Sequence, residues 1–164
     1  MKISLVTVTF NSGLTFNDTV QSVLSQTYPD VEYICVDGFS KDNTVSIMKE
    51  NELLFNGKLR WISEKDNGLY DAMNKGFHMA TGDVVGIINS DDLLAEPTAI
   101  EKVMKTFEEH PEADAVYADL YYVAQNDTSK IVRHWISGKQ RRFKYGWHPA
   151  HPTFYVCLLY TSDA

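Results

Sequence analysis

The sequence predicts an α/β fold with a mostly parallel sheet and helices on both of its faces. Short apolar runs rich in β-branched residues alternate along the chain with segments of helical period, which is the element order of βαβ units. Parallel strands joined by right-handed crossovers follow from that order. With 164 residues, 44% of them hydrophobic, and no linker-like stretch, the chain is expected to form one packed domain.

The chain begins with a predicted strand, helix and strand. Residues 3–10 are apolar and β-branched, which favours a strand. A helical pattern follows over residues 14–26, and Pro29 ends it because proline cannot continue a helix. The second predicted strand covers residues 31–36 and ends at Asp37.

The second βα unit has clear start and stop signals. A helix is predicted over residues 42–55, with Ser40 as its expected N-cap and Asn56-Gly57 as its stop. Residues 59–63 form the third predicted strand. Apolar side chains recur at helical spacing over residues 69–80, which predicts the next helix.

The remaining predicted elements are a strand, a helix and two further strand-like segments. Residues 84–88 are a continuous apolar run, as expected of a buried parallel strand. Pro97 opens a helix that extends to about residue 109. Two further strands are predicted over residues 115–123 and 131–136, with Asn126-Asp127 as turn material between them.

Polar side chains follow each of the first four predicted strands. They are Asn11, Asp37, the pair Glu64 and Asp66, and the pair Asp91 and Asp92. The carboxyl ends of parallel strands share one edge of the sheet, where α/β proteins place ligands, so these groups are expected to cluster. Each group also has a structural explanation, because aspartates are common in turns and at helix N-termini.

Asp91 and Asp92 are candidate metal ligands. Adjacent carboxylates repel each other near a low-dielectric edge, and a divalent cation that both of them face removes this cost. Their hard oxygens suit Mg²⁺ or Mn²⁺, which keep several waters and take further oxygens from substrate phosphates. The competing interpretation is a solvated loop in which the two aspartates form caps or turns.

The chain lacks the common glycine motifs that bind phosphate. Neither GxGxxG nor GxxxxGK[ST] occurs, so the dinucleotide fingerprint and the P-loop are both absent. A cation on Asp91 and Asp92 can instead bridge a diphosphate, while Asn11 and Asp37 can hydrogen-bond the edge of a nucleobase. These residues therefore predict a site for a nucleoside-diphosphate compound.

The charge of the chain argues against a general nucleic-acid binder. The formal net charge is −7 and the pI is about 5.1, whereas affinity for a phosphate backbone depends on clustered Lys and Arg. One basic cluster exists, formed by Lys139, Arg141, Arg142 and Lys144. Contact with substrate phosphates or with a membrane surface is one explanation for it, and a solvated loop is the other.

The sequence predicts a soluble cytoplasmic protein, with the inner face of the membrane as an alternative location. No apolar run approaches the roughly 18 residues that a membrane span needs, and residues 1–6 lack a signal-peptide pattern. Cys35 and Cys157 are the only cysteines, which excludes a disulfide framework and a CxxC metal site. A reducing compartment is therefore expected.

Several ordered motifs resemble family 2 glycosyltransferases with the GT-A fold. They are 4–11 (SLVTVTFN), 21–28 (QSVLSQTY), 36–44 (VDGFSKDNT), 64–76 (EKDNGLYDAMNKG), 80–83 (ATGD), 89–92 (NSDD) and 151–155 (HPTFY). The resemblance covers roughly residues 1–156 and is nearest to bacterial enzymes that build surface polysaccharides. It implies a GT-A-type, Rossmann-like sheet and transfer of a sugar from a nucleoside-diphosphate donor to an acceptor hydroxyl.

The resemblance implies roles for the matching positions. The residues that would line the nucleoside pocket are Thr9, Asn11, Asp37 and Asp66. Asp91 would lie near the ribose and the diphosphate, and Asp92 would coordinate Mg²⁺ or Mn²⁺. Asn74 and Lys75 match more loosely, at positions where the family places a polar and a basic residue near the donor. A UDP-type donor and a glycan or lipid-linked acceptor are implied.

Two histidines, His148 and His151, lie three positions apart, a spacing compatible with zinc. The sequence offers no third ligand, so zinc is not favoured. We instead expect His151 to lie near the sugar or the diphosphate as an auxiliary catalytic group, with a purely structural histidine as the alternative.

The resemblance also concerns the catalytic base. In this family a carboxylate well after the His-Pro-Thr-Phe segment takes the proton of the acceptor hydroxyl, which gives inversion by single displacement. This chain stops too early to contain it, and Asp119 is the only internal substitute considered. Residues 157–164 do not resemble the family's continuation. We therefore interpret the sequence as a C-terminally truncated transferase, with a domain over residues 1–156 that binds donor but transfers sugar poorly.

Two other classes of function compete with a glycosyltransferase. A sugar-1-phosphate nucleotidyltransferase also combines an α/β sheet, a metal and a nucleotide. Its first strand should be followed by a glycine-rich basic loop, whereas residues 11–13 are Asn-Ser-Gly without a nearby Lys or Arg. A nucleotide-binding or interaction module without catalysis is the second alternative, and metal-dependent nucleotide binding separates an interaction module from the enzymes.

Overall fold

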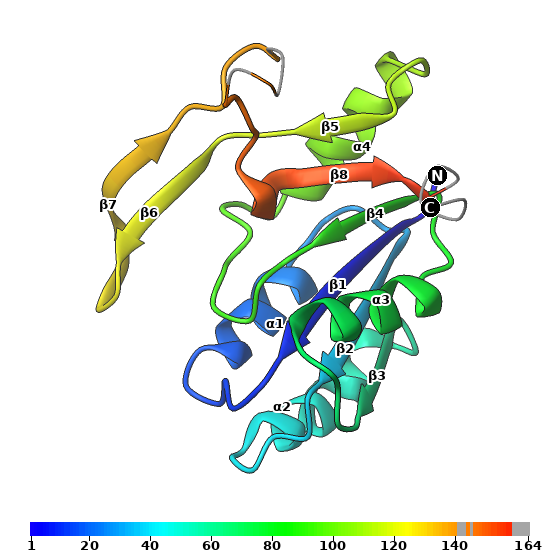
Figure 1. Ribbon diagram of the computed structural model, residues 1–164, viewed down its shortest axis with the longest axis vertical. Coiled ribbons are helices and arrows are strands. Elements are labelled where there is room, and N and C mark those ends of the chain that lie inside the picture. Colours follow the sequence, from blue (N-terminus) through cyan, green and yellow to red (C-terminus); the bar gives the residue numbers. More distant parts are fainter. Residues whose placement is uncertain (141–143, 145, 159–164) are drawn as a thin grey trace.

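The computed structural model describes residues 1–140, 144 and 146–158, and it contains a six-stranded sheet and a separate two-stranded ribbon (Figure 1). The strands are β1 (Ile3–Thr9), β2 (Val31–Asp37), β3 (Leu59–Ser63), β4 (Val84–Ile87), β5 (Ala115–Tyr117), β6 (Leu120–Ala124), β7 (Asp127–Trp135) and β8 (Phe154–Cys157). The helices are α1 (Phe16–Leu24), α2 (Thr44–Asn51), α3 (Leu69–Met79) and α4 (Ala99–Glu109), with short 3₁₀ turns η1 (Glu52–Phe55) and η3 (His151–Thr153).

The main sheet has the strand order β3-β2-β1-β4-β8-β5. The first four strands in this order are parallel, and β8 is antiparallel to both of its neighbours. A mostly parallel α/β sheet was predicted, and the structure confirms it. Because β1 to β4 run in one direction, the loops that follow them all leave the sheet at its carboxyl edge.

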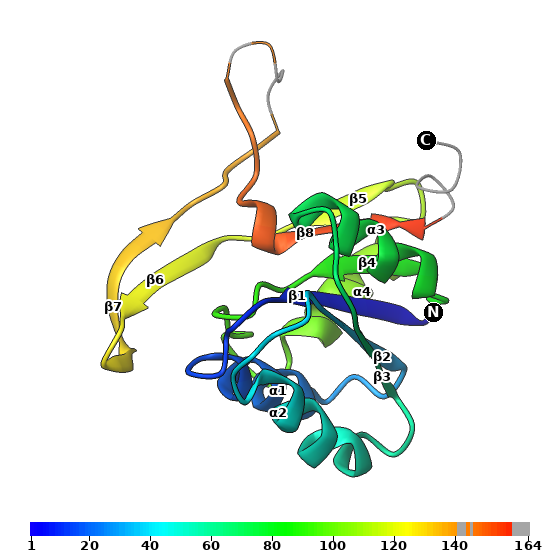
Figure 2. The ribbon, with the colours of Figure 1, turned by 60° about the horizontal axis from the view of Figure 1, so that its bottom comes forward.

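Helices cover both faces of the sheet, as predicted. In Figure 2, α3 lies on one side of the sheet and α1 and α2 lie on the other, where α4 joins them in the larger hydrophobic cluster. Alternate residues of β1 serve the two faces: Ile3 and Leu5 pack in the larger cluster, and Val6 and Val8 pack beneath α3. No helix within the described ranges is long and apolar enough to cross a bilayer.

Close packing of α3 on the sheet depends on Gly76. A Cβ at this position would lie 2.4 Å from Val6 Cγ1, which is far inside van der Waals contact. The absence of a side chain therefore lets α3 approach β1 closely, and this sets the position of the loop that precedes α3.

One strand prediction was wrong in detail, and one strand was missed. The predicted strand 115–123 is two strands in different sheets: β5 ends at Tyr117, and β6 begins at Leu120, opposite Trp135 of β7. The apolar and aromatic run hides the break because both strands use the same residue types. β8 was not predicted, although it inserts between β4 and β5.

The predicted boundaries of the second helix also need correction. Ser40 does not cap it, because α2 begins at Thr44, where Asp42 Oδ1 accepts a hydrogen bond from Thr44 N at 3.0 Å. The predicted helix 42–55 is an α-helix that continues as the 3₁₀ turn η1. Its predicted stop is confirmed, since Asn56 and Gly57 both adopt positive φ, at 51° and 80°.

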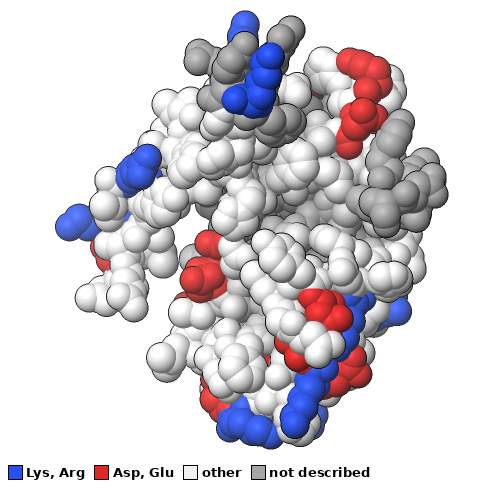
Figure 3. Space-filling view, viewed as in Figure 1, with Lys and Arg blue, Asp and Glu red and all other residues white. Residues whose placement is uncertain are grey.

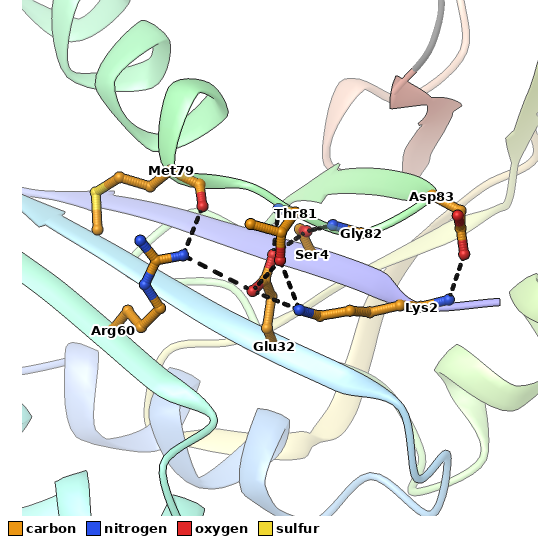
Figure 4. Close-up of polar contacts among 8 residues, drawn as sticks. All are labelled: Lys2, Ser4, Glu32, Arg60, Met79, Thr81, Gly82 and Asp83. Carbon is orange, nitrogen blue, oxygen red and sulfur yellow. Dashed lines mark hydrogen bonds and ion pairs between the residues drawn. The ribbon is translucent and has the colours of Figure 1, made fainter.

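A buried charged network closes the amino edge of the sheet (Figure 4). Glu32 is 5% exposed, and its carboxylate accepts hydrogen bonds from Lys2 Nζ at 2.9 Å and from Ser4 Oγ at 2.5 Å. Thr81 donates to it from its backbone nitrogen at 2.5 Å and from its hydroxyl at 2.9 Å. Burial by itself would raise the pKa of Glu32, but these hydrogen bonds outweigh it and lower the pKa to about 2.

Candidate functional site

The loops that follow β1 and β4 are joined at the carboxyl edge of the sheet. Ser12 Oγ lies 3.0 Å from Ser90 Oγ, and Thr15 Oγ1 donates to the carbonyl oxygen of Ser90 at 2.9 Å. Residues 89–92 form a turn in which Asp92 N donates to Asn89 O at 3.1 Å. The structure therefore holds the turn that carries Asp91 and Asp92 against the first loop of the chain.

The end of β1 is joined in turn to the loop after β2. Asn11 N donates to Ser40 Oγ at 2.7 Å, and Asn11 Oδ1 accepts from Lys41 N at 2.9 Å. The φ of Asn11 is 50°, a left-handed conformation that asparagine tolerates better than most residues. Thr9 is 6% exposed, and its hydroxyl has no hydrogen-bond partner among the described residues. The end of β1 therefore carries a buried hydroxyl whose hydrogen-bonding capacity is not used by any described residue.

Asp37 is fully buried at the end of β2. Its Oδ1 accepts from the hydroxyl of Ser40, and its Oδ2 accepts from Ser40 N at 3.0 Å and from Ser63 Oγ at 2.6 Å. Asp37 therefore holds the loop after β2 in shape and connects it to β3. This is the turn role that the sequence allowed as an alternative to ligand binding. Any contact with a nucleobase would be made by oxygens that already accept these hydrogen bonds.

Asp66 lies beside the same loop. Its Oδ1 accepts from Gly68 N at 2.9 Å, so Asp66 turns the chain into α3, close to the capping role that the sequence left open. A Cβ at Gly38 would lie 2.7 Å from Asp66 Oδ2, so the missing side chain lets the loops after β2 and β3 meet. The structure thus brings Asp37 and Asp66 into adjoining loops.

Lys75 fastens the loop before α3. Its Nζ donates to Lys65 O at 3.0 Å and forms ion pairs with Glu64 at 2.9 Å and Asp71 at 3.5 Å. The hydrogen bond to Glu64 and the nearby carboxylates raise the pKa of Lys75, so its ammonium group is charged at neutral pH. Asn74, the other loosely matched residue, is exposed on α3. The ammonium group of Lys75 is therefore engaged by groups of the protein itself, whereas the side chain of Asn74 is exposed to solvent.

Asp91 and Asp92 differ in their surroundings. Asp91 is exposed, whereas Asp92 is half-buried and accepts a hydrogen bond from Asn89 Nδ2 at 2.7 Å. Burial raises the pKa of Asp92; the Asn89 hydrogen bond opposes this, the charge of Asp91 adds to it, and His151 lowers it. Among the described residues, neither aspartate forms an ion pair with Lys or Arg. A partly desolvated carboxylate beside a second carboxylate is an arrangement that a divalent cation stabilises.

The donor set fits Mg²⁺ or Mn²⁺ rather than zinc. These cations need only one or two carboxylates when water and phosphate supply the remaining oxygens. A zinc site needs more protein ligands, and no group of three His, Cys, Asp or Glu that could hold a metal occurs in the part of the chain that the structure describes. His148 packs its ring near that of Trp135, with the centroids 5.7 Å apart.

The direction of β8 explains why His151 influences Asp92. β8 is antiparallel to β4, with Gly86 opposite Tyr155, so the residues before β8 lie at the carboxyl edge. η3 belongs to this segment and places His151 near Asp92, whose pKa it lowers. From the sequence, residues 151–155 were interpreted only as a family motif, and no strand was predicted there. The run Phe-Tyr-Val-Cys after Thr153, rich in residues that favour strands, is the signal that would have revealed β8.

Asp119 follows β5, which is parallel to β4, and it therefore also lies toward the carboxyl edge. Its Oδ1 accepts from Ser137 N at 2.8 Å, and its Oδ2 lies 3.3 Å from His134 Nε2. These contacts give Asp119 a structural role where the chain enters β6. Its candidacy as a catalytic base stays a prediction.

The basic cluster is only partly described. Lys139 and Lys144 are exposed, and Arg141 and Arg142 lie outside the described residues.

Figure 3 shows acidic side chains on the surface between the body of the protein and the projecting ribbon.

A cavity of about 390 Å³ lies at the amino edge of the sheet, away from this cluster of loops. It is lined by Lys2, Asp30, Val31, Glu32, Gly57, Lys58, Arg60 and Thr81. Its basic groups are already bonded: Lys2 to Glu32, Lys58 to the carbonyl of Pro29, and Arg60 to the carbonyl of Met79. This cavity has a structural explanation, and we do not place the functional site there.

Sequence reasoning missed the hydroxyl groups that join the loops. These groups belong to Ser12, Thr15, Ser40, Ser63 and Ser90. Each lies at or just beyond the carboxyl end of a strand, or at the start of a helix that follows one, and this position was the available signal. Each forms a hydrogen bond with a residue 26 to 78 positions away in the sequence, so the sequence could not pair them.

Comparison with known proteins identifies relatives of this chain. The family model described as Glycosyl transferase family 2 matches residues 4–162. A "PGL/p-HBAD biosynthesis glycosyltransferase" of Mycobacterium tuberculosis is 32% identical over 123 residues, which is 75% of this chain and 48% of that protein. An uncharacterized glycosyltransferase of Nostoc sp. is 31% identical over 108 residues, covering 66% of this chain and 33% of the relative. The chain therefore spans half or less of these relatives.

Solved structures share the fold. Staphylococcus aureus TarS 1–349 superposes with a TM-score of 0.75 at 19% identity, covering 99% of this chain and 49% of that one. The same protein has been solved in complex with UDP-GlcNAc. A mannosyltransferase from Pyrobaculum calidifontis, in complex with GDP-Man and Mn²⁺, gives a TM-score of 0.66 at 22% identity over 78% of this chain and 37% of its own. At these identities the likeness shows the fold alone.

Proposed function

This chain belongs to glycosyl transferase family 2, and on that premise we propose that it binds a nucleoside-diphosphate sugar for transfer to an acceptor hydroxyl. The observation that carries the proposal is the half-buried Asp92 beside Asp91, held against the loop after β1 at the carboxyl edge of the sheet. A pocket edge with several convergent polar groups is the expected place for such a ligand. Relatives of the same fold are solved with UDP-GlcNAc and with GDP-Man and Mn²⁺.

We propose that the nucleoside lies over the loops after β1, β2 and β3. The residues that would line it are Thr9, Asn11, Asp37 and Asp66, with Asn74 and Lys75 at the rim. Among the described residues the buried hydroxyl of Thr9 has no hydrogen-bond partner, and the buried Asp37 holds the loop after β2 through its hydrogen bonds to Ser40 and Ser63. Asp91 would face the ribose and diphosphate. A UDP-type donor is favoured by the family resemblance.

The proposed chemistry is sugar transfer with inversion. Mg²⁺ or Mn²⁺, held by Asp92 and Asp91, would supply positive charge that stabilises the leaving diphosphate. The aspartates would orient the donor. A carboxylate on the opposite face of the sugar would take the proton of the acceptor hydroxyl, and Asp119 is the internal candidate for that role. His151 would help as an auxiliary group, because it already lies near Asp92.

The acceptor and the location of the protein are part of the proposal. A glycan or a lipid-linked acceptor, in bacterial polysaccharide or glycan biosynthesis, agrees with the family. The basic cluster that begins at Lys139 would contact phosphates of a substrate or of a membrane, with the cytoplasm or the inner membrane face as the place of action. The division at residue 156 also stays a prediction.

A panel of nucleoside diphosphates, each with and without Mn²⁺, tests the proposal by thermal stabilisation. A ligand at one hundred times its Kd adds about 2.7 kcal/mol of stability, which raises the melting temperature of a chain this size by about 5 to 11 °C. We expect UDP with Mn²⁺ to give such a rise. If no nucleoside diphosphate stabilises the protein with or without metal, the proposal is wrong.

Activity measurements separate the remaining alternatives. Donor hydrolysis and transfer with UDP-sugars would identify a glycosyltransferase. Release of pyrophosphate from UTP and a sugar 1-phosphate would identify a nucleotidyltransferase instead. Metal-dependent UDP binding without any turnover would indicate a nucleotide-binding module.

Replacing Lys75 by Met is expected to weaken nucleotide binding without unfolding the protein. The variant loses both ion pairs that fasten the loop of Asp66, but exposed ion pairs contribute little to stability. We therefore expect an unchanged melting temperature and a severalfold higher Kd for UDP with Mn²⁺ by calorimetry. The matched control is Lys105→Met, which removes an exposed pair with Glu109 on α4. Equal affinities for the two variants would exclude this role of Lys75.

A further inference from the structure

The ribbon formed by β6 and β7, together with Ile136, projects away from the body of the protein (Figures 1 and 2). We call residues 120–136 the arm. β6 and β7 pair only with each other, and neither joins the six-stranded sheet. An isolated two-stranded ribbon is marginal in water unless something covers it, so the arm is a candidate interaction surface.

Both faces of the arm are open and rich in apolar and aromatic side chains. Its exposed hydrophobic residues are Tyr121, Tyr122, Val123, Ile131, Val132 and Ile136. Val132 is 67% exposed and Ile136 is 69% exposed, so the arm presents large aliphatic side chains to solvent along its length. Tyrosine and tryptophan combine an apolar ring with a polar group, and such residues favour the interface between water and lipid.

The arm and the residues after it are basic, in contrast to the rest of the chain. Within the arm, Lys130 and Arg133 outnumber the single acidic residue Asp127, in a chain whose net charge is −7. No acidic residue occurs in the sequence from 137 to 144, which contains Lys139, Arg141, Arg142 and Lys144. The Cζ atom of Arg133 lies 5.6 Å from the ring centroids of both Tyr122 and Trp135, so its guanidinium group is next to both aromatic rings. Figure 3 shows the basic side chains of the arm on an otherwise mostly uncharged surface.

From these observations we propose that the arm docks the protein on a lipid bilayer rich in anionic phospholipid. Basic side chains beside aromatic and aliphatic ones match a surface that offers negative headgroups above apolar chains. The outer backbone groups of a two-stranded ribbon are unpaired, and such groups are not tolerated in the hydrocarbon core. The arm therefore lies in the headgroup layer and does not span the membrane. Contacts at its base hold the segment after the arm to β5 and the residue that follows it: Tyr117 OH donates to Gly138 O at 2.9 Å, and Ser137 Oγ donates to Ala118 O at 2.8 Å.

Vesicle binding tests this proposal on the whole chain without nucleotide. We expect the protein to sediment with vesicles of equal parts phosphatidylglycerol and phosphatidylcholine, to ignore pure phosphatidylcholine, and to be released by high salt. Val132→Ser with Ile136→Ser should weaken binding about tenfold, because both side chains lose apolar contact with lipid. Lys130→Gln with Arg133→Gln should weaken binding to the anionic vesicles about fivefold for each charge.

The control variant is Leu53→Ser with Leu54→Ser. These leucines are also exposed, at 86% and 56%, but they lie on η1, away from the arm, and the variant should bind vesicles like the wild type. Three results would overturn the proposal: no preference for anionic vesicles, an equal loss in the control, or self-association in sedimentation velocity that the arm variants abolish. The last result would identify a second copy as the partner. The assay contains no nucleotide, so its outcome is independent of the proposed nucleotide binding and sugar transfer.

Discussion

Replacing Asp92 by Asn is expected to abolish metal-dependent nucleotide binding while the fold stays intact. The side chain keeps its shape and an oxygen that can accept the hydrogen bond from Asn89, but it loses the charge that would hold the cation. We expect the Kd for UDP in the presence of Mn²⁺ to rise about 100-fold or more, since the removal of residues that only support metal ligands already costs 10 to 100-fold. Calorimetry with and without Mn²⁺ measures this directly.

The same variant should not lose stability. Burial raises the pKa of Asp92 in the folded protein above its ordinary value, so ionisation of this group opposes folding as the pH rises through that pKa. Asp92→Asn removes the penalty, and its melting temperature at neutral pH should equal or exceed that of the wild type. Asp114→Asn, an exposed aspartate that precedes β5 at the opposite edge, is the control for the loss of one charge. Unchanged UDP affinity in Asp92→Asn would contradict the proposed metal site.

Replacing Glu32 by Gln should destabilise the protein strongly without altering the candidate site. The two carboxylate oxygens of Glu32 accept from Lys2, Ser4 and Thr81, and a glutamine amide cannot accept all of these hydrogen bonds. Leaving a buried hydrogen-bonding group without its partner costs about 1 to 3 kcal/mol, which corresponds to about 2 to 12 °C in melting temperature. The exposed Glu109→Gln is the control, because its ion pair with Lys105 is open to solvent.

The pH dependence of this difference tests the cause. The folded-state pKa of Glu32 is lowered from 4.5 to about 2, so its contribution is complete above pH 4.5 and disappears as the pH falls toward 2. The stability difference between wild type and Glu32→Gln should therefore shrink in acid. A difference that stays constant from pH 7 to pH 3 would show that packing, not charge, explains it.

The main sheet could be predicted from the sequence because its signals are local. β1 to β4 are short apolar runs separated by helices with clear periodicity, and polar residues such as Asn11 and Asp92 follow them directly. β8 was harder to predict, because its run Phe-Tyr-Val-Cys favours a strand but is only four residues long, and its partners β4 and β5 lie far away in the sequence. The break at Ala118-Asp119 is likewise fixed by tertiary contacts, including the hydrogen bond from Ser137 N to Asp119.

The candidate site was predictable in its composition but not in its contacts. Position after a strand was enough to name Asp37, Asp66 and Asp92. Their partners are decided by how the loops pack, as in the approach of Asp66 to Gly38 and the ion pairs that commit Lys75 to the protein. Glu32 carried no sequence signal, because a single acidic residue in an apolar strand does not reveal its partners.

The most direct test of the account is to locate bound Mn²⁺ by its effect on backbone NMR signals in the presence of UDP. Paramagnetic broadening should remove the amide signals of Ser12, Ser90 and Asp92, which lie where the loops after β1 and β4 meet. The amide signals of Gly57 and Thr81, which line the cavity at the opposite edge, should stay sharp. Broadening centred on Gly57 and Thr81, or no UDP-dependent broadening near Asp92, would contradict a metal–nucleotide site at the carboxyl edge of the sheet.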